Sequence, residues 1–352
     1  MSVNDLTGKV GEWLRGIGPM ADIVISSRIR LARNLANFPF LCRASEDERR
    51  EIFRTLTEAF SSAKLDHNTY LLDMEELDEI DRQVLVERHL ISKQHADGEG
   101  CRGVAVSASE TRALMINEED HLRMQVLRSG LQLEPLWEEI SDIDNQIEAQ
   151  TSFAFDEKLG YLTACPTNVG TGLRVSVMLH LPALKMTGEI EKVLRAAKDL
   201  RLAVRGLYGE GTDAIGDFYQ ISNQITLGHS EEEIIEKFSE NIIPRIVEYE
   251  RAARNALADE RSMQLDDKVW RAYGILENAR TMASDETLFF LSHVRMGVSM
   301  GRLQGIDVGT INELFLRIQP AHLQKMHGHA LNGEERSVAR AKYLRSRLGH
   351  QN

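Results

Sequence analysis

The stretch DIVISSRIRLA, residues 22–32, decides the fold class because hydrophobic and polar residues alternate along it. In an extended chain Ile29 and Leu31 lie on one face, and Ser26, Arg28 and Arg30 lie on the other. The pattern predicts a β-strand with one buried side and one polar side. Such alternation is typical of antiparallel or mixed sheets, since the strands of parallel sheets are buried on both sides.

Further strand-like stretches follow, and helical stretches separate them. The expected strands are GVAVSAS (103–109), RALMINE (112–118), GYLTACP (160–166), LRVSVMLHL (173–181) and DFYQISNQITLG (217–228). The expected helices cover residues 45–65, 133–150 and 188–204, and the first of them opens with the capping box Ser45 and Glu48. We therefore predict an α+β fold with a mainly antiparallel sheet flanked by helices.

The character of the sequence changes near residue 230. The capping box Ser230 and Glu233 opens a helix there, and Pro244 should kink or break it. Every later patterned stretch is helical. We expect three parts: a lead-in over residues 1–20, an α+β domain over 21–255 and an all-helical C-terminal domain over 256–352.

Composition excludes several classes of protein. Of 352 residues, 42% are hydrophobic and 27% charged, which is a soluble globular balance, and the net charge of -12 argues against a general nucleic-acid binder. No apolar run approaches the ~18 residues of a membrane span, and the N-terminus lacks the apolar segment of a signal peptide. Cys42, Cys101 and Cys165 form no CxxC pair, so we expect a protein of the reducing cytoplasm without a disulfide framework.

Arginines recur on the polar faces or at the ends of the expected strands. They are Arg28, Arg30, Arg123, Arg174 and Arg205. Each one alone could be a solvated surface arginine. As a set they indicate a site for a polyanion such as a phosphate chain, because guanidinium groups bind phosphate bidentately and keep their charge.

The phosphate-binding motifs of the common nucleotide enzymes are absent. There is no GxxxxGK[ST] loop, and the HRD and DFG elements of the common protein kinases are missing. The arginines would then neutralise a triphosphate, align it with the acceptor and stabilise the moving phosphoryl group. With ATP as the donor, Mg²⁺ would be expected as well.

The stretch NEEDHLRMQ, residues 117–125, holds three acids followed by an arginine. In an extended backbone Glu119 and Arg123 would project on one face roughly 13 Å apart, from a rise of about 3.3 Å per residue. Glu118 and Asp120 would then point away, and would shape the loop or cap a neighbour.

Four stretches, in this order, resemble the signatures of the phosphagen kinases, the ATP:guanido phosphotransferases that include arginine kinase and creatine kinase. They are SSRIRLAR (26–33), NEEDHLRMQ (117–125), CPTNVGTGLR (165–174) and RGLYGEGTDAIGDFYQISNQITLG (205–228). The resemblance implies a phosphagen-kinase-like catalytic domain over residues 21–255. It also implies ATP as the phosphoryl donor.

The resemblance assigns a role to each matching residue. The ATP ligands would be His89, in VERHLIS, and the five arginines Arg28, Arg30, Arg123, Arg174 and Arg205. The catalytic residues would be the base Glu119, a second glutamate Glu210 that holds the substrate guanidinium, and Cys165 near the substrate.

One branch, the bacterial protein-arginine kinases, matches more closely. Other phosphagen kinases carry a helical domain before the arginine pair, whereas here the pair begins at Arg28 and a helical domain follows. ERSVARA (335–341) resembles the RDxxRA motif of that branch, with Ser337 in place of the aspartate, and implies a phosphoarginine pocket that includes Arg336 and Arg340. The branch also implies an allosteric, cytoplasmic homodimer of the stress response that works with an activator protein and Clp-type proteases.

The expected acceptor is an arginine side chain, whose guanidinium has a pKa above ~12 and is a poor nucleophile while protonated. Glu119 and Glu210 could bind the planar fork, fix its orientation and accept the proton. Cys165 could tune the acceptor nitrogen as a thiolate, or could be a small buried thiol. The histidines of AHLQKMHGHA (321–330) lack acidic or cysteine partners at ligand spacing, so we expect them to be exposed and expect no metal site.

The leading hypothesis is an ATP-dependent kinase that phosphorylates arginine residues in proteins, because an acceptor site without a preceding domain should admit a protein segment. Basic, repressor-like or unfolded proteins would suit the acidic chain as substrates. One alternative is a kinase for free arginine or another small guanidine. Another is a non-catalytic adaptor that binds ATP or phosphoarginine. We expect no direct nucleic-acid or membrane partner.

Overall fold

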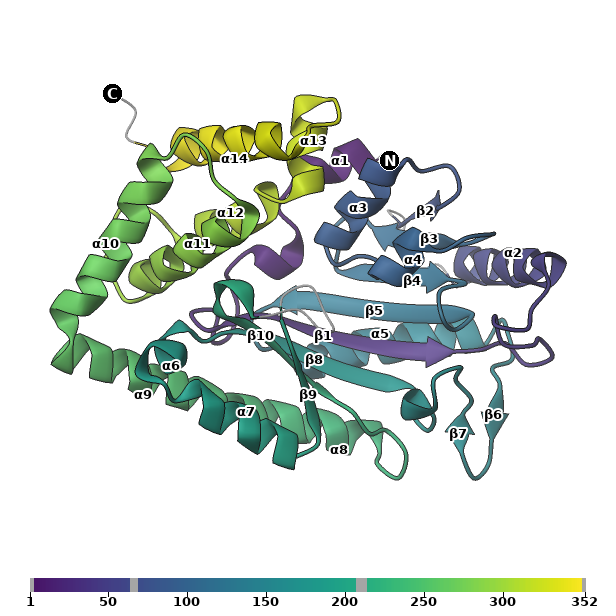
Figure 1. Ribbon diagram of the computed structural model, residues 1–352. Coiled ribbons are helices and arrows are strands. Elements are labelled where there is room, and N and C mark those ends of the chain that lie inside the picture. The colour runs from purple at the N-terminus through teal and green to yellow at the C-terminus, as the bar shows by residue number, and fades with distance from the viewer. Residues whose placement is uncertain (1–2, 64–68, 207–213, 350–352) are drawn as a thin grey trace.

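The computed structural model describes residues 3–63, 69–206 and 214–349, which contain one large sheet (Figure 1). Among these residues the sheet has eight strands in the order β2-β3-β4-β5-β1-β8-β10-β9, and every neighbouring pair is antiparallel. The strands are β1 Val24–Arg33, β2 Thr69–Asp73, β3 Gly103–Ser107, β4 Arg112–Ile116, β5 Leu122–Ser129, β8 Leu173–His180, β9 Leu202–Arg205 and β10 Phe218–Asn223. A separate hairpin consists of β6 Phe155–Asp156 and β7 Gly160–Tyr161. The predicted α+β fold with an antiparallel sheet is confirmed.

One face of the sheet is aliphatic and packs against helices. Ile29 and Leu31 of β1 are fully buried, as their alternation predicted, and they share a core with Ile140 and Ile147 of α5 (Leu133–Glu148). Other helices continue this layer: α7 (Ile190–Asp199) contacts β9, α8 (Glu231–Glu236) contacts β8, and α6 (Pro182–Thr187) contacts α9 (Ile243–Glu260). The polar side chains of the strands therefore lie on the opposite face.

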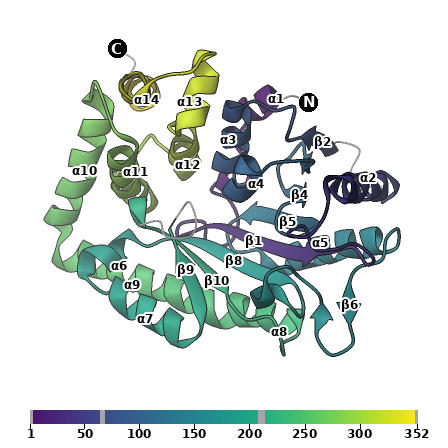
Figure 2. The same ribbon diagram turned by 45° about the vertical axis from the view of Figure 1, so that its right-hand side comes forward.

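The N-terminal segment is part of the packed structure. It contains α1 (Val3–Thr7) and the 3₁₀ turn η1 (Glu12–Leu14), and η1 contacts β5 and β1. Trp13 and Leu14 are buried in the main core, so the described part of the expected lead-in is anchored in the fold. Nearby lie α2 (Glu46–Ser62), α3 (Glu79–Glu87) and α4 (Lys93–Asp97), on the side of the sheet edge formed by β2 to β4 (Figure 2).

Every described element after β10 is helical, which confirms the predicted C-terminal helical region. Its later helices are α10 Ser262–Asn278, α11 Ser284–Ser299, α12 Val308–Arg317, α13 Pro320–His327 and α14 Gly333–Leu348. A π-helical turn, Lys237–Ile242, separates α8 from α9, and Pro244 lies in the first turn of α9, where its missing N–H is tolerated. α9 runs through the boundary that we predicted between residues 255 and 256, so that boundary stays a prediction.

The helical region meets the sheet domain at several points. α12 contacts η1, and α13 contacts both α1 and α3. α11 contacts the short 3₁₀ turn Ile215–Asp217 that precedes β10. No helix among the described residues is long and apolar enough to cross a membrane.

Candidate active site

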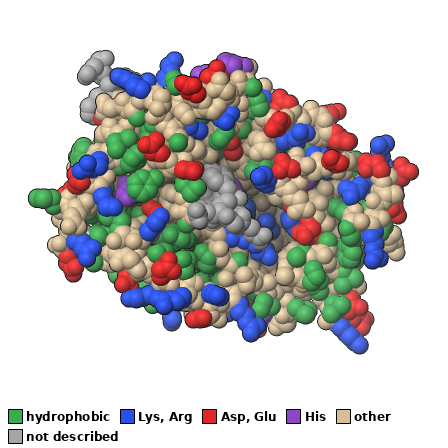
Figure 3. All heavy atoms as spheres, in the orientation of Figure 1, with side chains coloured by type: hydrophobic (Ala, Val, Ile, Leu, Met, Phe, Trp, Pro, Cys, Tyr) green, Lys and Arg blue, Asp and Glu red, His purple; other side chains and the backbone are tan. Residues whose placement is uncertain are grey.

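The five arginines singled out from the sequence project from one face of the sheet, as the strand register shows. They are Arg28, Arg30, Arg123, Arg174 and Arg205. Arg30 stands opposite Arg174 of β8 and Gln125 of β5, so these three side chains lie on the same face. Residues two apart on a strand share a face, which adds Arg28, two positions from Arg30, and Arg123, two positions from Gln125. Arg205 of β9 stands opposite Gln220 of β10, which in turn stands opposite Met178 of β8 on the same face. Figure 3 shows Lys and Arg side chains in a hollow near the middle of the molecule.

Burial and mutual repulsion lower the pKa of two of these arginines. The pKa of Arg28 falls to about 10, because of burial first and then Arg174 and Arg205. Burial, together with Arg28, Arg123 and Arg174, holds the pKa of Arg30 well below its ordinary value. The buried Arg30 Nε has no hydrogen-bond partner among the described residues. An anion on this face would satisfy that donor and offset the repulsion.

Neutral side chains orient Arg28 from the neighbouring strands. Its Nη2 donates a hydrogen bond to Gln220 Oε1 (2.9 Å), and its Nε donates to Ser176 Oγ (3.3 Å). Together with Met178 and His89 these residues line a pocket over the polar face. The pocket therefore has a fixed guanidinium in its wall, held by amide and hydroxyl groups that do not cancel its charge.

The residues between β4 and β5 form an acidic turn, and Arg123, the second residue of β5, contacts its three carboxylates. Its Nη1 lies 2.5 Å from Glu118 Oε2, and its Nη2 lies 2.7 Å from Glu119 Oε2 and 3.3 Å from Asp120 Oδ2. Burial alone would lower the pKa of Arg123, but the three acids outweigh burial and raise it. Arg123 is therefore charge-compensated within the chain, unlike Arg28.

The expected separation of roughly 13 Å between Glu119 and Arg123 is wrong, because it assumed an extended backbone. Residues 117–121 form bends rather than a strand, and Asn117 takes a left-handed φ of 59°. The expectation that Glu118 points away is also wrong. Its carboxylate accepts a hydrogen bond from Ser92 Oγ (2.5 Å), and although burial opposes this, Arg123 and Ser92 lower the pKa of Glu118.

Asp120 fits the supporting role that the sequence suggested for it. The side chain is fully buried, and its Oδ1 accepts hydrogen bonds from Asn34 Nδ2 and from the backbone N–H of Ala164, each at 2.7 Å. These bonds tie the acidic turn to the end of β1 and to the segment just before Cys165. Asn34 was not among the predicted site residues, and its only signal in the sequence is that it directly follows the arginine motif SSRIRLAR.

Cys165 and Glu119 are both accessible from outside. The Glu119 side chain is 35% exposed, and Cys165 is a partly exposed free thiol whose Sγ lies 3.0 Å from Thr167 Oγ1. The alternative of Cys165 as a fully buried core thiol does not match this position. Its chemical role stays a prediction.

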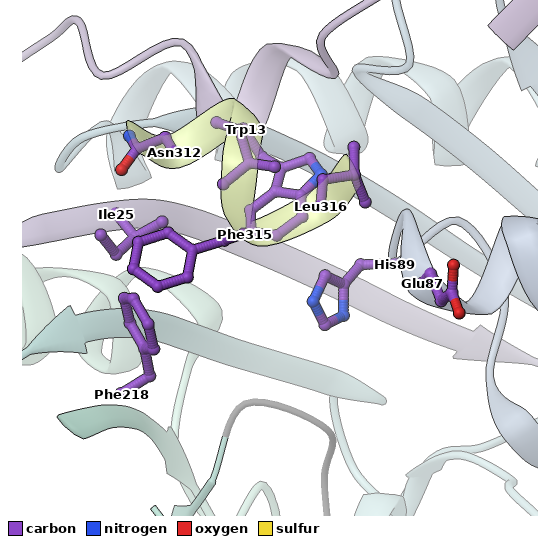
Figure 4. A pocket seen from close by; sticks show the side chains of 9 residues that line it. Trp13, Ile25, Glu87, His89, Phe218, Asn312, Phe315 and Leu316 are labelled. Atoms are coloured by element: carbon purple, nitrogen blue, oxygen red, sulfur yellow. The ribbon is translucent and has the colours of Figure 1, made fainter. Parts of the chain in front are cut away.

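His89 lies beside the arginine face, between α3 and the N-terminal segment (Figure 4). Its ring packs edge-on against Trp13, with centroids 4.6 Å apart, and Gln125 Nε2 donates a hydrogen bond to its carbonyl (2.6 Å). Burial, and after it Arg28, lowers the pKa of His89 to about 3, so the ring is neutral near pH 7. Phe315 and Leu316 of α12 line the same pocket as His89, so the helical region borders this pocket.

Three predicted site residues remain, and two of them, Arg336 and Arg340, lie on α14. Glu210 lies outside the described residues. Arg340 is almost fully buried, and its Nε and Nη1 donate hydrogen bonds to the carbonyls of Ile318 and Met282. Arg336 donates to the Leu331 carbonyl (2.6 Å) and lines a surface hollow that also contains carboxylates from α3 and its N-cap. A phosphoarginine pocket at Arg336 and Arg340 stays a prediction.

The expectation that His322 is exposed is wrong. His322 is fully buried, its Nδ1 lies 2.6 Å from Glu87 Oε2, and its Nε2 lies 3.2 Å from Arg88 Nη1. Arg88 in turn forms a buried ion pair with Glu110 (2.6 Å). No local pattern of residues marks this cluster, because its partners are up to 235 residues apart.

Comparison with known protein families agrees with this geometry. Residues 51–253 match the family described as ATP:guanido phosphotransferase, C-terminal catalytic domain, and residues 262–352 match the protein-arginine kinase McsB C-terminal domain. The first match begins after β1, so Arg28 and Arg30 lie outside it.

Named relatives cover nearly the whole chain. A protein-arginine kinase of Halothermothrix orenii is 49% identical over 351 residues, which are 99% of both chains. One of Symbiobacterium thermophilum is 47% identical over 352 residues, again 99% of both.

Solved structures share the fold. A lombricine kinase superposes with a TM-score of 0.59 at 28% identity, covering 70% of both chains. A duplicated taurocyamine kinase from Schistosoma mansoni gives a TM-score of 0.60 at 26% identity. The match covers 70% of this chain and 35% of the taurocyamine kinase chain.

Proposed function

The chain belongs to the ATP:guanido phosphotransferases, in the protein-arginine kinase branch, and from this premise we propose that it transfers the γ-phosphoryl group of ATP to arginine side chains of proteins. The single observation that supports this best is the joining of two unlike regions in one site. Arginines lie together on one face of the sheet, the pKa values of Arg28 and Arg30 among them are lowered, and an accessible glutamate stands in the acidic turn at its end.

The arginine face suits the phosphates of ATP. Arg28 and Arg30 lie in the middle of it, with Arg174 and Arg205 as close electrostatic neighbours. Phosphate oxygens would accept a hydrogen bond from Arg30 Nε and would neutralise the excess positive charge of this face. His89 and Trp13 would border the nucleoside side of the pocket, with His89 neutral.

Mg²⁺ would accompany the nucleotide. The described residues contain no group of three or more His, Cys, Asp or Glu side chains placed to hold a metal ion, so the ion would be carried by phosphate oxygens and water. When bound, it would neutralise part of the charge on the β- and γ-phosphates.

Glu119 would act on the acceptor. A carboxylate binds the planar guanidinium fork in a fixed orientation and can take the proton that leaves as the N–P bond forms. Arg123 holds Glu119 in place and, with Asp120, fixes the turn. Cys165 would contact the acceptor from the segment that Asp120 anchors, and Glu210 would be the second clamp of the guanidinium.

The transfer itself depends on alignment and charge. The moving phosphoryl group passes through a loose transition state, so the arginines act by holding donor and acceptor in line and by stabilising equatorial oxygens. Because these guanidiniums are fixed by sheet register before the reaction, little reorganisation is needed at the moment of transfer.

Finer features are proposed with this function. The substrates would be basic repressor-like or unfolded proteins, and an activator protein and a Clp-type protease would be partners in a stress response. A cytoplasmic location fits the three free thiols. Exposed Met263 and Trp270 on α10 offer an apolar surface for a homodimer.

The test offers radiolabelled ATP to the protein together with free arginine or with an unfolded arginine-rich protein. Acid-labile label on the protein substrate supports the proposal. Label on free arginine alone would indicate a small-molecule kinase, and bound ATP without transfer to either acceptor would indicate an adaptor. Glu119→Gln serves as the control, with transfer lost and ATP binding retained.

A further inference from the structure

Four exposed hydrophobic side chains lie beside the loop that carries Cys165. Phe155 (59% exposed) and Leu159 (46%) belong to the β6–β7 hairpin, and Ile225 (37%) and Leu227 (51%) follow β10. We call these four residues the acceptor-side patch. The hairpin projects from the body of the molecule in Figures 1 and 2, and hydrophobic side chains are visible over this region in Figure 3.

The segments that carry the patch are in direct contact with the Cys165 loop. The Phe155 ring packs edge-on against Tyr161, with centroids 5.3 Å apart, and the Tyr161 N–H donates to the Gly170 carbonyl (2.8 Å). On the other side a Cβ at Gly170 would lie only 3.0 Å from Leu227 Cα. The loop from Cys165 to Gly170 therefore runs between the two halves of the patch.

The patch adjoins the predicted acceptor site. The hairpin leads directly into Leu162, whose carbonyl accepts a hydrogen bond from Asn34 Nδ2 (3.0 Å), and Ala164 donates to Asp120. Asp120 is the residue after Glu119, the predicted base. A chain that places an arginine at Glu119 and Cys165 would thus extend over Phe155 or Leu227.

The segments that carry or adjoin the patch hold more acidic than basic side chains, with Lys158 as the basic residue of the hairpin. The acidic residues are Glu148, which accepts from Tyr161 Oη, Asp156 and Glu157 in the hairpin, and Glu231, Glu232 and Glu233 in the first turn of α8. Burial raises the pKa of Tyr161 and Arg33 opposes the rise, while Asp144, Glu148 and Glu231 add to it; Asp144 is itself paired with Arg33, which leaves Glu148 and Glu231 as the acids that act on this ring. The surroundings therefore favour a ligand of positive charge with apolar side chains.

We propose that the acceptor-side patch binds the residues that flank the target arginine in an unfolded protein segment with apolar side chains near that arginine. The proposal rests on the proposed function and names its substrate class. Folded proteins bury most large apolar side chains, whereas an unfolded segment presents them next to its arginines. Free arginine has no flanking residues and gains nothing from the patch.

The test compares two unstructured peptides with one central arginine, one with leucine and phenylalanine on both sides and one with serine there. Burying one or two half-exposed apolar side chains predicts a kcat/KM about tenfold higher for the first peptide. Phe155→Ser combined with Leu227→Ser should remove that difference while the rate with the serine peptide and the affinity for ATP stay unchanged. Tyr249→Ser is the matched control, since it removes a similarly exposed aromatic side chain (58% exposed) on α9, outside the patch.

Three results would overturn the proposal. The wild-type protein would handle both peptides equally, the double variant would keep its preference for the apolar peptide, or the double variant would change the oligomeric state in sedimentation. The last result would assign the patch to a second copy of this chain. Failure of the proposed function is distinct, because then the wild-type protein would phosphorylate neither peptide.

Discussion

Replacing Arg88 by methionine should destabilise the protein strongly, because Arg88 is the centre of a buried ionic cluster. Its Nε and Nη2 donate to the two oxygens of Glu110 at 2.7 and 2.6 Å, and neither residue is more than 1% exposed. Nη2 also donates to the Lys9 carbonyl (2.9 Å), and Nη1 contacts His322. One side chain therefore joins α3, the β3–β4 turn, the N-terminal segment and α13.

The expected magnitude follows from what the substitution leaves behind. Methionine fills much of the volume but leaves the Glu110 carboxylate buried without its cation, which costs about 3–5 kcal/mol in comparable buried pairs. The lost hydrogen bond to Lys9 adds about 1 kcal/mol. Urea unfolding followed by tryptophan fluorescence measures the loss, and Trp13 lies close to the cluster through His89.

Two comparisons make the reasoning refutable. Arg88→Met together with Glu110→Leu should recover much of the stability, since a well-packed apolar pair can replace a buried ion pair. Arg54→Met, which breaks the exposed pair with Glu51, should change little. A loss below about 1 kcal/mol for Arg88→Met, or a double variant less stable than the single one, would refute the assignment of this pair as a buried, mutually dependent unit.

Three other predictions concern the site and its pH dependence. Arg30→Ala should weaken ATP binding about tenfold or more in calorimetry. Arg128→Ala should not weaken it, because Arg128 lies on the other face of β5 and is paired with Glu139. Equal effects of the two substitutions would remove Arg30 from the phosphate site. Asp120→Asn should lower kcat up to about 100-fold with little change in the KM for ATP, because Asp120 positions the acidic turn; a normal kcat would contradict this. Burial lowers the pKa of His95 from its ordinary value of 6.5 to about 4 in the folded protein. Below pH 6.5 the unfolded state therefore binds more protons at this residue than the folded state does. Stability should therefore fall as the pH drops from 6.5 towards 4, by up to about 3 kcal/mol from this residue, and urea unfolding of His95→Asn should show a smaller fall.

The sequence predicted the strands β1, β3, β4, β8 and β10 because alternation is a local signal, but it did not predict β2 or β5, and the expected helix over residues 188–204 overlaps β9. Ile29 and Leu31 marked the buried face of β1, and Arg28 and Arg30 the polar face, before any neighbour was known. That all five arginines share one face also needs register, which residue patterns do not supply. Register puts Arg174 opposite Arg30 and Arg205 opposite Gln220.

The predictions from the sequence were wrong where the backbone leaves regular geometry or where segments distant in the sequence meet. The separation between Glu119 and Arg123 was predicted too large because an extended backbone was assumed. The left-handed backbone of Asn117 starts a turn, and the two side chains approach to 2.7 Å. His322 seemed exposed because its own stretch is polar. Its partner Glu87, which also accepts the backbone N–H groups of Ala321 and His322, comes from a helix in the other half of the chain.

The electrostatics of the site differ between its two ends, and this difference has a consequence for function. Arg123 is paired with three carboxylates, so this end carries a net negative charge and keeps its geometry with or without a phosphate nearby. Arg28 is oriented by an amide and a hydroxyl, and its lowered pKa records the cost of holding it among other arginines. Binding of a triphosphate would remove that cost, so part of the binding free energy would appear as increased stability of the whole sheet. In the proposed function such a site would attract ATP by charge at one end, while the acidic end would orient a cationic acceptor and accept its proton. This division suits a reaction that needs alignment more than covalent chemistry.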